Sequence, residues 1–258
     1  MAKNIIFYFT GTGNSLKAAR DIAAAVGSCE LAAISGYKNR IIPDGYERIG
    51  VVFPVYAAGP PNRVKRFLAE TDFSACHNAY FFAAATCGGY AGNSFPIVRK
   101  LLKDKGITLD AAFPIRSFAN FVALYNMSEN GGKIQARAKR LTGAAAERVL
   151  RKERTKLRTV ANPLFTLMHG AAKRYPEQDK GFQISHACAA CGLCVSVCPA
   201  KNIALTGGRP DFRHRCEQCM ACIQLCPNRA IDYKNKTQKR RRYINPYITP
   251  DDLKHTEG

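Results

Sequence analysis

The feature that most constrains this chain of 258 residues is a cysteine pattern that occurs twice in its last third. The stretches "CAACGLCVSVCP" and "CEQCMACIQLCP" contain eight of the eleven cysteines at identical spacings, so that Cys188 matches Cys216 and Cys198 matches Cys226. Thiols at this spacing are typical of metal sites rather than of a disulfide framework. We therefore predict a duplicated metal-binding unit, which we delimit as residues 182–234.

Each run matches C-x2-C-x2-C-x3-C-P, which bacterial ferredoxins use to hold 4Fe-4S clusters. Three thiolates of a tight loop can reach corners of one cube, and a short helical turn carries the fourth toward the other cube. We expect one cluster on Cys188, Cys191, Cys194 and Cys226, and a second on Cys216, Cys219, Cys222 and Cys198. Zinc also takes four thiolates, but its sites usually show two C-x2-C pairs, so the pattern favours clusters.

The first 120 residues alternate apolar runs with helical patterns, which is typical of β-α-β units and a parallel sheet. We expect strands near 4–9, 30–34, 48–53, 79–85 and 112–117, and helices over 14–26, 62–70 and 94–105. Runs such as "AYFFAAA" do not alternate between apolar and polar residues, as expected for strands covered on both faces. The fold class predicted for this half is α/β with a doubly wound parallel sheet.

The stretch "FTGTGNS", residues 9–15, follows the first predicted strand and opens a helix. A Walker A loop would need a Gly-Lys pair that is missing, and a dinucleotide fingerprint would need glycine where Leu16 stands. Hydroxyls, backbone N–H groups and a helix N-terminus can hold a phosphate without a lysine. The sequence therefore indicates a monophosphate site, although a turn built for geometry alone would use similar residues.

On this loop the chain resembles the flavodoxin family, in the variant of anaerobes that is fused to a ferredoxin domain. Two further loops match by position, "PVYAAGPPN" after the third strand and "TCGGYAGN" after the fourth. The resemblance implies an FMN site in which Tyr56 and Tyr90 flank the flavin ring and nearby glycines admit its edge. The residues it assigns to FMN are Thr10, Gly11, Thr12, Gly13, Asn14, Ser15, Pro54, Val55, Tyr56, Ala57, Ala58, Gly59, Thr86, Cys87, Gly88, Gly89, Tyr90 and Asn93.

The net charge of +20 is concentrated in the second half of the chain. Residues 1–130, the expected FMN-binding domain, carry +5, and the remainder carries +15. A basic helical segment spans residues 133–160, as one helix or two, within a connecting region of 131–181. A basic tail of 235–258 follows the small α+β ferredoxin-like unit. Such charge suits a solvated face or docking to an acidic redox partner, and no recognised nucleic-acid fold accompanies it.

Together the motifs predict a protein that transfers electrons between two 4Fe-4S clusters and a bound FMN, as a relay or as a flavin-dependent reductase acting on a small-molecule substrate. A redox-responsive regulator and an empty structural module are the alternatives. The five histidines lie apart and no motif assigns a catalytic residue. No apolar run is long enough to cross a membrane, and the N-terminus lacks a signal-peptide pattern, so we expect a cytoplasmic protein.

Overall fold

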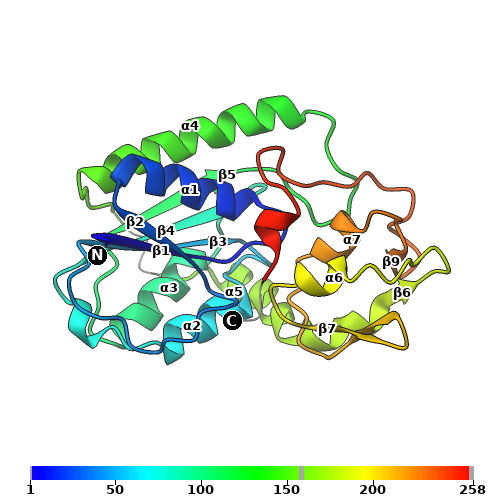
Figure 1. The fold of residues 1–258 in the computed structure, drawn as a ribbon. Helices are drawn as coiled ribbons and strands as arrows, with labels where there is room; N and C mark the ends of the chain where they lie inside the picture. The colour runs from blue at the N-terminus through cyan, green and yellow to red at the C-terminus, as the bar shows by residue number, and fades with distance from the viewer. Residues whose placement is uncertain (1, 157–159, 256–258) are drawn as a thin grey trace.

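The computed structural model describes residues 2–156 and 160–255, and its centre is a five-stranded parallel sheet (Figure 1). The strands are β1 (Asn4–Tyr8), β2 (Cys29–Ala33), β3 (Arg48–Pro54), β4 (Tyr80–Cys87) and β5 (Ala111–Arg116). Their order is β2-β1-β3-β4-β5, and each pairing is parallel. This is the order of flavodoxin-like doubly wound sheets, in which ligands bind where the order reverses. The predicted α/β fold class of the first half is confirmed.

Helices cover both faces of this sheet, which explains why its strands are apolar on both sides. They are α1 (Asn14–Val26), α2 (Asn62–Glu70), α3 (Ser94–Lys103) and α4 (Gly131–Leu150). Figure 1 shows α1 and α4 above the sheet and α2 and α3 below it. Every residue of β4 is buried, so its uninterrupted apolar run follows from its place inside the sheet.

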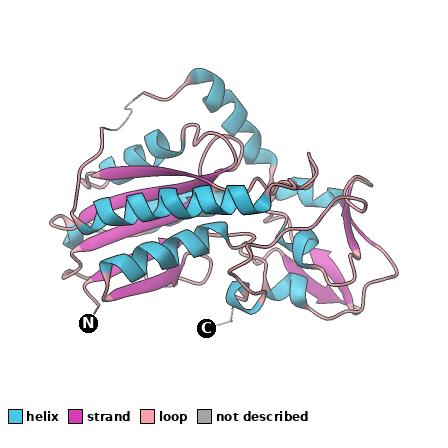
Figure 2. Cartoon of the chain, turned by 90° about the horizontal axis from the view of Figure 1, so that it is seen from above, coloured by secondary structure: helices cyan, strands magenta, loops and turns pink. Residues whose placement is uncertain are grey.

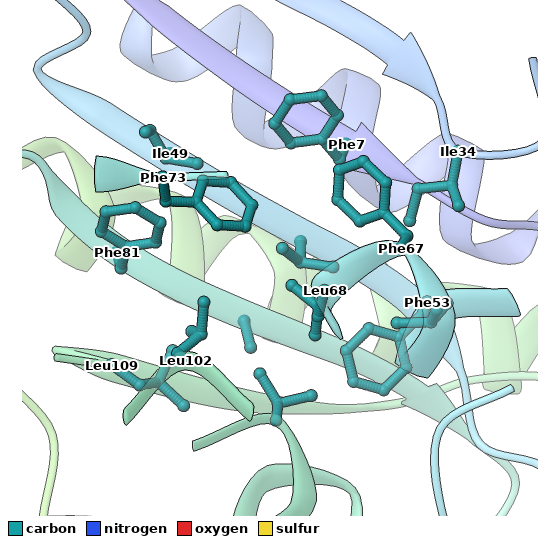
Figure 3. Packing of buried hydrophobic residues seen from close by; sticks show 14 of the residues in the cluster. Phe7, Ile34, Ile49, Phe53, Phe67, Leu68, Phe73, Phe81, Leu102 and Leu109 are labelled. Atoms are coloured by element: carbon teal, nitrogen blue, oxygen red, sulfur yellow. The ribbon is translucent and has the colours of Figure 1, made fainter. Parts of the chain in front are cut away.

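Phenylalanine rings pack among aliphatic side chains in the core on the side of α2 and α3 (Figure 3). The rings of Phe7 and Phe67 have centroids 4.8 Å apart, and those of Phe73 and Phe81 are 5.7 Å apart at a steep angle. Both geometries are favourable for aromatic pairs, and each buried ring contributes about 1.5–3 kcal/mol through burial. This core fixes the ends of β1, β3 and β4, from which the three predicted loops emerge.

The basic segment forms one helix that is shorter than predicted. Helix α4 ends at Leu150, and Lys152 follows with a φ of +52°, which stops the helix well before residue 160. The chain then runs along the edge of β5, where Thr155 N–H donates to the Asp110 carbonyl and Ala112 N–H donates to Thr155 Oγ1. The edge strand therefore gains hydrogen bonds that a continued helix could not supply.

A further helix, α5 (Pro163–Gly170), lies within what we expected to be only a connector. Asn162 caps it by accepting from the N–H groups of Leu164 and Phe165, and Pro163 occupies the first turn. This Asn-Pro start is a standard helix signal. Single 3-10 turns follow at Ala171–Arg174 and Pro176–Gly181.

The cysteine-rich half contains two antiparallel strand pairs, which lie beside the large sheet in both views (Figures 1 and 2). Strand β6 (Phe182–Ile184) pairs with β9 (Ile231–Tyr233), and β7 (Ile203–Thr206) pairs with β8 (Arg209–Phe212). Two short helices, α6 (Leu193–Ser196) and α7 (Ala221–Leu225), each contain the third cysteine of a run, Cys194 and Cys222. The offset that relates the two cysteine runs also relates β6 to β8, α6 to α7 and β7 to β9. The duplication in sequence is therefore a duplication in structure.

The tail folds back onto the first half instead of extending into solvent. Asn245 N–H donates to the Thr12 carbonyl at 2.9 Å, and Arg20 pairs with Asp252 at 2.6 Å. The tail contains a 3-10 turn at Asp251–Leu253, and His255 N–H donates to the Ser196 carbonyl. These contacts join the "FTGTGNS" loop to the cysteine-rich half. Across the described ranges, the structure contains no helix with the length and apolar character needed to cross a bilayer.

Candidate functional site

A cavity of about 290 Å³ lies at the carboxyl ends of β1, β3 and β4. This edge is where parallel sheets of this order bind ligands, and the volume is close to the lower limit of about 300 Å³ for small-molecule sites. Twelve of the eighteen residues assigned to FMN line the cavity. They are Thr10, Gly11, Thr12, Asn14, Ser15, Pro54, Val55, Tyr56, Ala57, Thr86, Cys87 and Gly88.

The other six residues lie outside the cavity lining. Gly13 turns the first loop with a φ of +95°, a conformation that favours glycine. Gly59 packs so closely on the His169 ring that a Cβ at this position would clash with it. Ala58 accepts a hydrogen bond from Asn93 N–H through its carbonyl, which ties the second loop to the third. These residues determine the conformation of the loops without lining the cavity.

Tyr90 is the clearest departure from the expected flavin contacts. Its side chain is 76% exposed and lies under the Arg116 guanidinium, 5.8 Å from the ring centroid. Tyr90, Gly89 and Asn93 line a different hollow, on the far side of the 86–93 loop. Only Tyr56 of the two expected aromatic residues therefore reaches the cavity.

The first loop leaves backbone donors free at the cavity. Gly13 N–H donates to Thr10 Oγ1, and the hydroxyls of Ser15 and Thr86 share a hydrogen bond of 2.8 Å. No hydrogen bond in the described part of the chain uses the N–H groups of Thr12, Asn14 or Ser15. These groups stand at the N-terminus of α1, whose first turn has no acidic residue. The arrangement suits an anion.

Sequence reasoning missed a fourth loop of the cavity, residues 117–125 after β5. Phe118, Asn120 and Tyr125 line the cavity, and the Asn120 side-chain amide donates to Thr12 Oγ1. The Phe118 ring stacks on Tyr243 of the tail, with centroids 3.9 Å apart. The strand topology could have indicated this loop, because β5 ends at the same edge of the sheet as β1, β3 and β4.

The cysteine-rich half contributes Gln218 and Cys219 to the cavity wall, and the connecting region contributes Tyr175. A Cβ on Gly11 would lie 3.0 Å from Cys219 Cβ and 3.1 Å from Tyr56 Oη, so the first loop packs directly against the second cysteine run. Burial raises the pKa of Tyr56 well above its usual value, and the neighbouring Cys219 acts in the same direction. Tyr56 is thus a neutral, partly buried side chain that lines the cavity together with Cys219.

The first predicted thiol set is brought together. Cys188, Cys191, Cys194 and Cys226 line one small cavity, so the fourth cysteine of the second run joins the first run. Burial raises the pKa of Cys194 to about 11, with Cys226 as its strongest charged neighbour. We call these four thiols the outer thiol set, because Cys191 is exposed and the other three are half-buried.

The second predicted set, Cys198, Cys216, Cys219 and Cys222, forms the inner thiol set. Burial raises the pKa values of Cys219 and Cys222 well above normal, and Cys198 and Cys216 add to the effect in both cases. The four groups therefore lie within electrostatic range of one another. The described residues contain no group of three or more His, Cys, Asp or Glu side chains that could hold one metal ion.

The backbone around both sets repeats residue by residue. Three pairs of equivalent positions in the two units share a positive φ: Ala190 and Gln218, Gly192 and Met220, and Lys201 and Arg229. In each unit an N–H group that follows the last cysteine donates to its sulfur, from Asn202 to Cys198 at 3.3 Å and from Ala230 to Cys226 at 3.2 Å. Such turns aim N–H groups at negative charge.

Glu217 fastens the inner thiol set to the α/β half. This carboxylate is only 4% exposed and accepts from the N–H groups of Asn62 at 2.9 Å and Arg63 at 2.7 Å, at the start of α2. We expect Glu217→Ala to lower the free energy of unfolding by about 1–3 kcal/mol, because two buried donors lose their acceptor. Glu217→Gln should lose less.

Anaerobic urea denaturation measures this effect. The matched control is Glu129→Ala, since Glu129 is an exposed carboxylate whose ion pair with Arg241 is on the surface. That change should stay within about 1 kcal/mol of the parent. Equal losses in the two variants would show that Glu217 does not hold the halves together.

Comparisons with known proteins give weak likenesses to flavoproteins. No protein-family model matches the chain, and the curated proteins searched include no match. The chain is similar to an FMN-dependent NADH-azoreductase from Bacillus anthracis, at 10% identity over 58% of this chain and 100% of that one, with a TM-score of 0.43. It is also similar to a flavodoxin from Megasphaera elsdenii, at 18% identity over 56% of this chain and 98% of that one, with a TM-score of 0.37.

A third solved structure, rubredoxin oxygen:oxidoreductase from Desulfovibrio gigas, has 16% identity over 58% of this chain and a TM-score of 0.41. The chain spans 36% of the length of that enzyme. At these TM-scores the likenesses carry no argument of their own. The flavodoxin-like assignment of the sheet therefore depends on its strand order.

Proposed function

We propose that this protein transfers electrons between two 4Fe-4S clusters and a bound FMN. The observation that carries the proposal is the wall that the two sites share: Cys219 belongs to the inner thiol set and also lines the cavity beside Tyr56 and Gly11. A cluster exchanges single electrons, whereas a flavin accepts one or two. Placing both groups at one wall suits a redox relay or a flavin-dependent reductase.

The cavity fits FMN in the chemistry of its donors. The free N–H groups of Thr12, Asn14 and Ser15 can bind a phosphate at the positive end of α1. The tail supports that loop, since Asn14 Oδ1 accepts from Tyr243 Oη at 2.6 Å and from Asn245 at 2.9 Å. Tyr56 and the glycine-rich strand ends supply flat, close-packed walls for a ring.

The arrangement of the thiol sets fits 4Fe-4S clusters, although it does not fit a single metal ion. A cube binds each of its four cysteines through a different iron, so the thiols surround a volume rather than one point. The outer thiol set surrounds such a cavity. The N–H groups that point at Cys198 and Cys226 stabilise thiolates and the bonds they form with iron.

Arg242 provides a second sign of a missing anion. Its three guanidinium nitrogens are buried and have no hydrogen-bond partner among the described residues. The side chain lies within electrostatic range of Asp232 and, more weakly, of Cys226 of the outer set and Cys222 of the inner set. A buried cation without a partner is costly, and the sulfurs of a bound cluster would supply acceptors.

We expect Arg242→Gln to lower the midpoint potentials of the clusters. A buried positive charge favours the reduced state, which is more negative, so its removal favours the oxidised state. EPR-monitored potentiometry measures the shift. Arg241→Gln is the matched control, because Arg241 is a neighbouring exposed arginine. Equal potentials in parent and Arg242→Gln would contradict the placement of this cation.

The difference in burial between the two sets indicates which set exchanges electrons with an external partner. The outer thiol set reaches solvent through Cys191, whereas Cys198, Cys216 and Cys222 of the inner set are buried. An external donor or acceptor protein therefore has access to the outer set, and the inner set adjoins the cavity. Partners of negative charge would be favoured by the basic second half of the chain.

Stepwise anaerobic reduction, followed by absorbance and EPR, tests the proposed function. We expect flavin and cluster signals to change together and to re-equilibrate rapidly after each addition of reductant. A flavin that stays oxidised beside reduced clusters would contradict a relay. That result would favour the regulator alternative, in which the exposed outer set senses oxidant.

A further inference from the structure

A second hollow, of about 570 Å³, lies behind the loop that carries Thr86, Cys87 and Gly88 of the candidate flavin cavity. It runs beside the outward-facing residues of β5 and is bounded by the starts of α3 and α5 and by one face of α4. Four cations line it: Arg116, Arg137, Arg140 and Lys156. We call this hollow the arginine groove.

These four cations make no ion pair within the described part of the chain, and no carboxylate lines the groove. The arginines that follow on the same segment behave differently. Arg148 and Arg151 both pair with Glu153, and Arg154 pairs with Asp110 at 3.0 Å. The groove thus gathers like charges without compensation, and an anion bound there would relieve their repulsion.

Apart from Asn93 and Asn162, the remaining lining is apolar and partly aromatic. Tyr90 lies under the Arg116 guanidinium, and Phe95 and Leu141 also face the hollow. Arg137, Arg140 and Leu141 share one face of α4 because they are spaced three and four residues apart. A concave site that combines apolar walls with a few cations is typical of small-molecule binding, whereas a protein-docking patch is usually flatter.

The groove and the flavin cavity adjoin one another. Burial raises the pKa of the Cys87 thiol, which lines the flavin cavity, to about 11, and Arg116 and Arg137 of the groove oppose that rise. The field of the groove therefore reaches the wall of the other site. Gly88 lines the flavin cavity, and the next residue, Gly89, lines the groove.

We propose that the arginine groove binds a small organic anion, namely a molecule with a flat apolar body and a carboxylate or phosphate group. Arginine guanidiniums bind such groups through two parallel hydrogen bonds. Tyr90 would pack against the body. This binding requires neither the flavin nor the clusters, so it goes beyond the proposed function.

Isothermal titration of the full-length, anaerobically purified protein with phenyl phosphate tests this site. We expect saturable binding of phenyl phosphate. Inorganic phosphate should bind more weakly because it lacks the apolar body, and phenol should bind more weakly because it lacks the anionic group. The variant Arg137→Gln/Arg140→Gln should lose at least about tenfold in affinity, since charge-assisted contacts are lost. The control Lys103→Gln/Lys133→Gln removes two exposed charges that do not line the groove and should keep the parent affinity.

Several outcomes would overturn the site. Absence of binding by the parent would do so, as would equal losses in the two double variants. Binding of a polyglutamate peptide without binding of phenyl phosphate would show a protein-docking surface in its place. Flavin is quantified in the same sample. A protein that lacks flavin but binds phenyl phosphate in the groove contradicts the proposed function and leaves this inference standing.

Discussion

Replacing Cys219 with alanine is expected to remove about half of the iron, from about eight atoms per chain to about four, because a 4Fe-4S cluster needs all four thiolates. The outer thiol set shares no ligand with the inner set and should keep its cluster. The inner set should also stop exchanging electrons with the flavin, since Cys219 forms the wall between them. Iron analysis and EPR of the anaerobic protein measure both effects.

Cys29→Ala is the matched control for this prediction. Cys29 is a half-buried thiol on β2, outside both sets and outside the cavity lining. The Cys29→Ala substitution should leave the iron content and the electron exchange unchanged. Full iron content in Cys219→Ala would contradict the assignment of this cysteine as a ligand.

Gly11→Ala is expected to weaken FMN binding by about tenfold to a hundredfold. The added Cβ would lie 3.0 Å from Cys219 Cβ and 3.1 Å from the carbonyl oxygen of Cys219. Backbone at that distance cannot move aside without displacing the second cysteine run, and overpacking of this kind costs about 1–3 kcal/mol. The loop would shift away from the phosphate that its N–H groups are placed to bind.

Equilibrium titration of the flavin-depleted protein with FMN measures this loss. Gly36→Ala serves as the control, because nothing lies within 4 Å of a Cβ at Gly36 and the residue does not line the cavity. Its FMN affinity should equal that of the parent. Unchanged affinity in Gly11→Ala would mean that the first loop does not pack against Cys219 when flavin binds.

Local patterns predicted the sheet and its helices well. Helix α2 begins at Asn62 and ends at Glu70, as expected, and β4, predicted at 79–85, begins one residue later and ends at Cys87. These elements are determined by hydrophobic period and by their own turns. The grouping of Cys226 with the first cysteine run was also predictable, because the spacing of the pattern limits which thiols can meet.

Contacts between distant segments could not be predicted in this way. Nothing near Gly11 in the sequence indicates that Cys219, which belongs to the last third of the chain, packs against it. The same holds for the tail, where Asn245 donates to the Thr12 carbonyl. Such contacts depend on how the two units pack against each other, and this packing produces no periodic pattern of residues in the sequence.

Two local predictions went astray for physical reasons. The basic segment was predicted to stay helical as far as residue 160, but the helix ends at Leu150, and Thr155 hydrogen-bonds to the free edge of β5 at Asp110 and Ala112. Tyr90 follows β4 as a flavin-stacking residue should, yet it turns outward and packs under Arg116. In the first case pairing with a free strand edge replaced the predicted helix, and in the second a cation–π contact replaced the predicted flavin contact.

The most direct test of the central claim is the composition of the protein purified without oxygen. Iron, acid-labile sulfide and flavin are measured on one sample against the protein concentration. Two 4Fe-4S clusters and one flavin site predict about eight iron atoms, about eight sulfides and about one FMN per chain. Zinc in place of iron, about four iron atoms, or the absence of flavin would contradict the account.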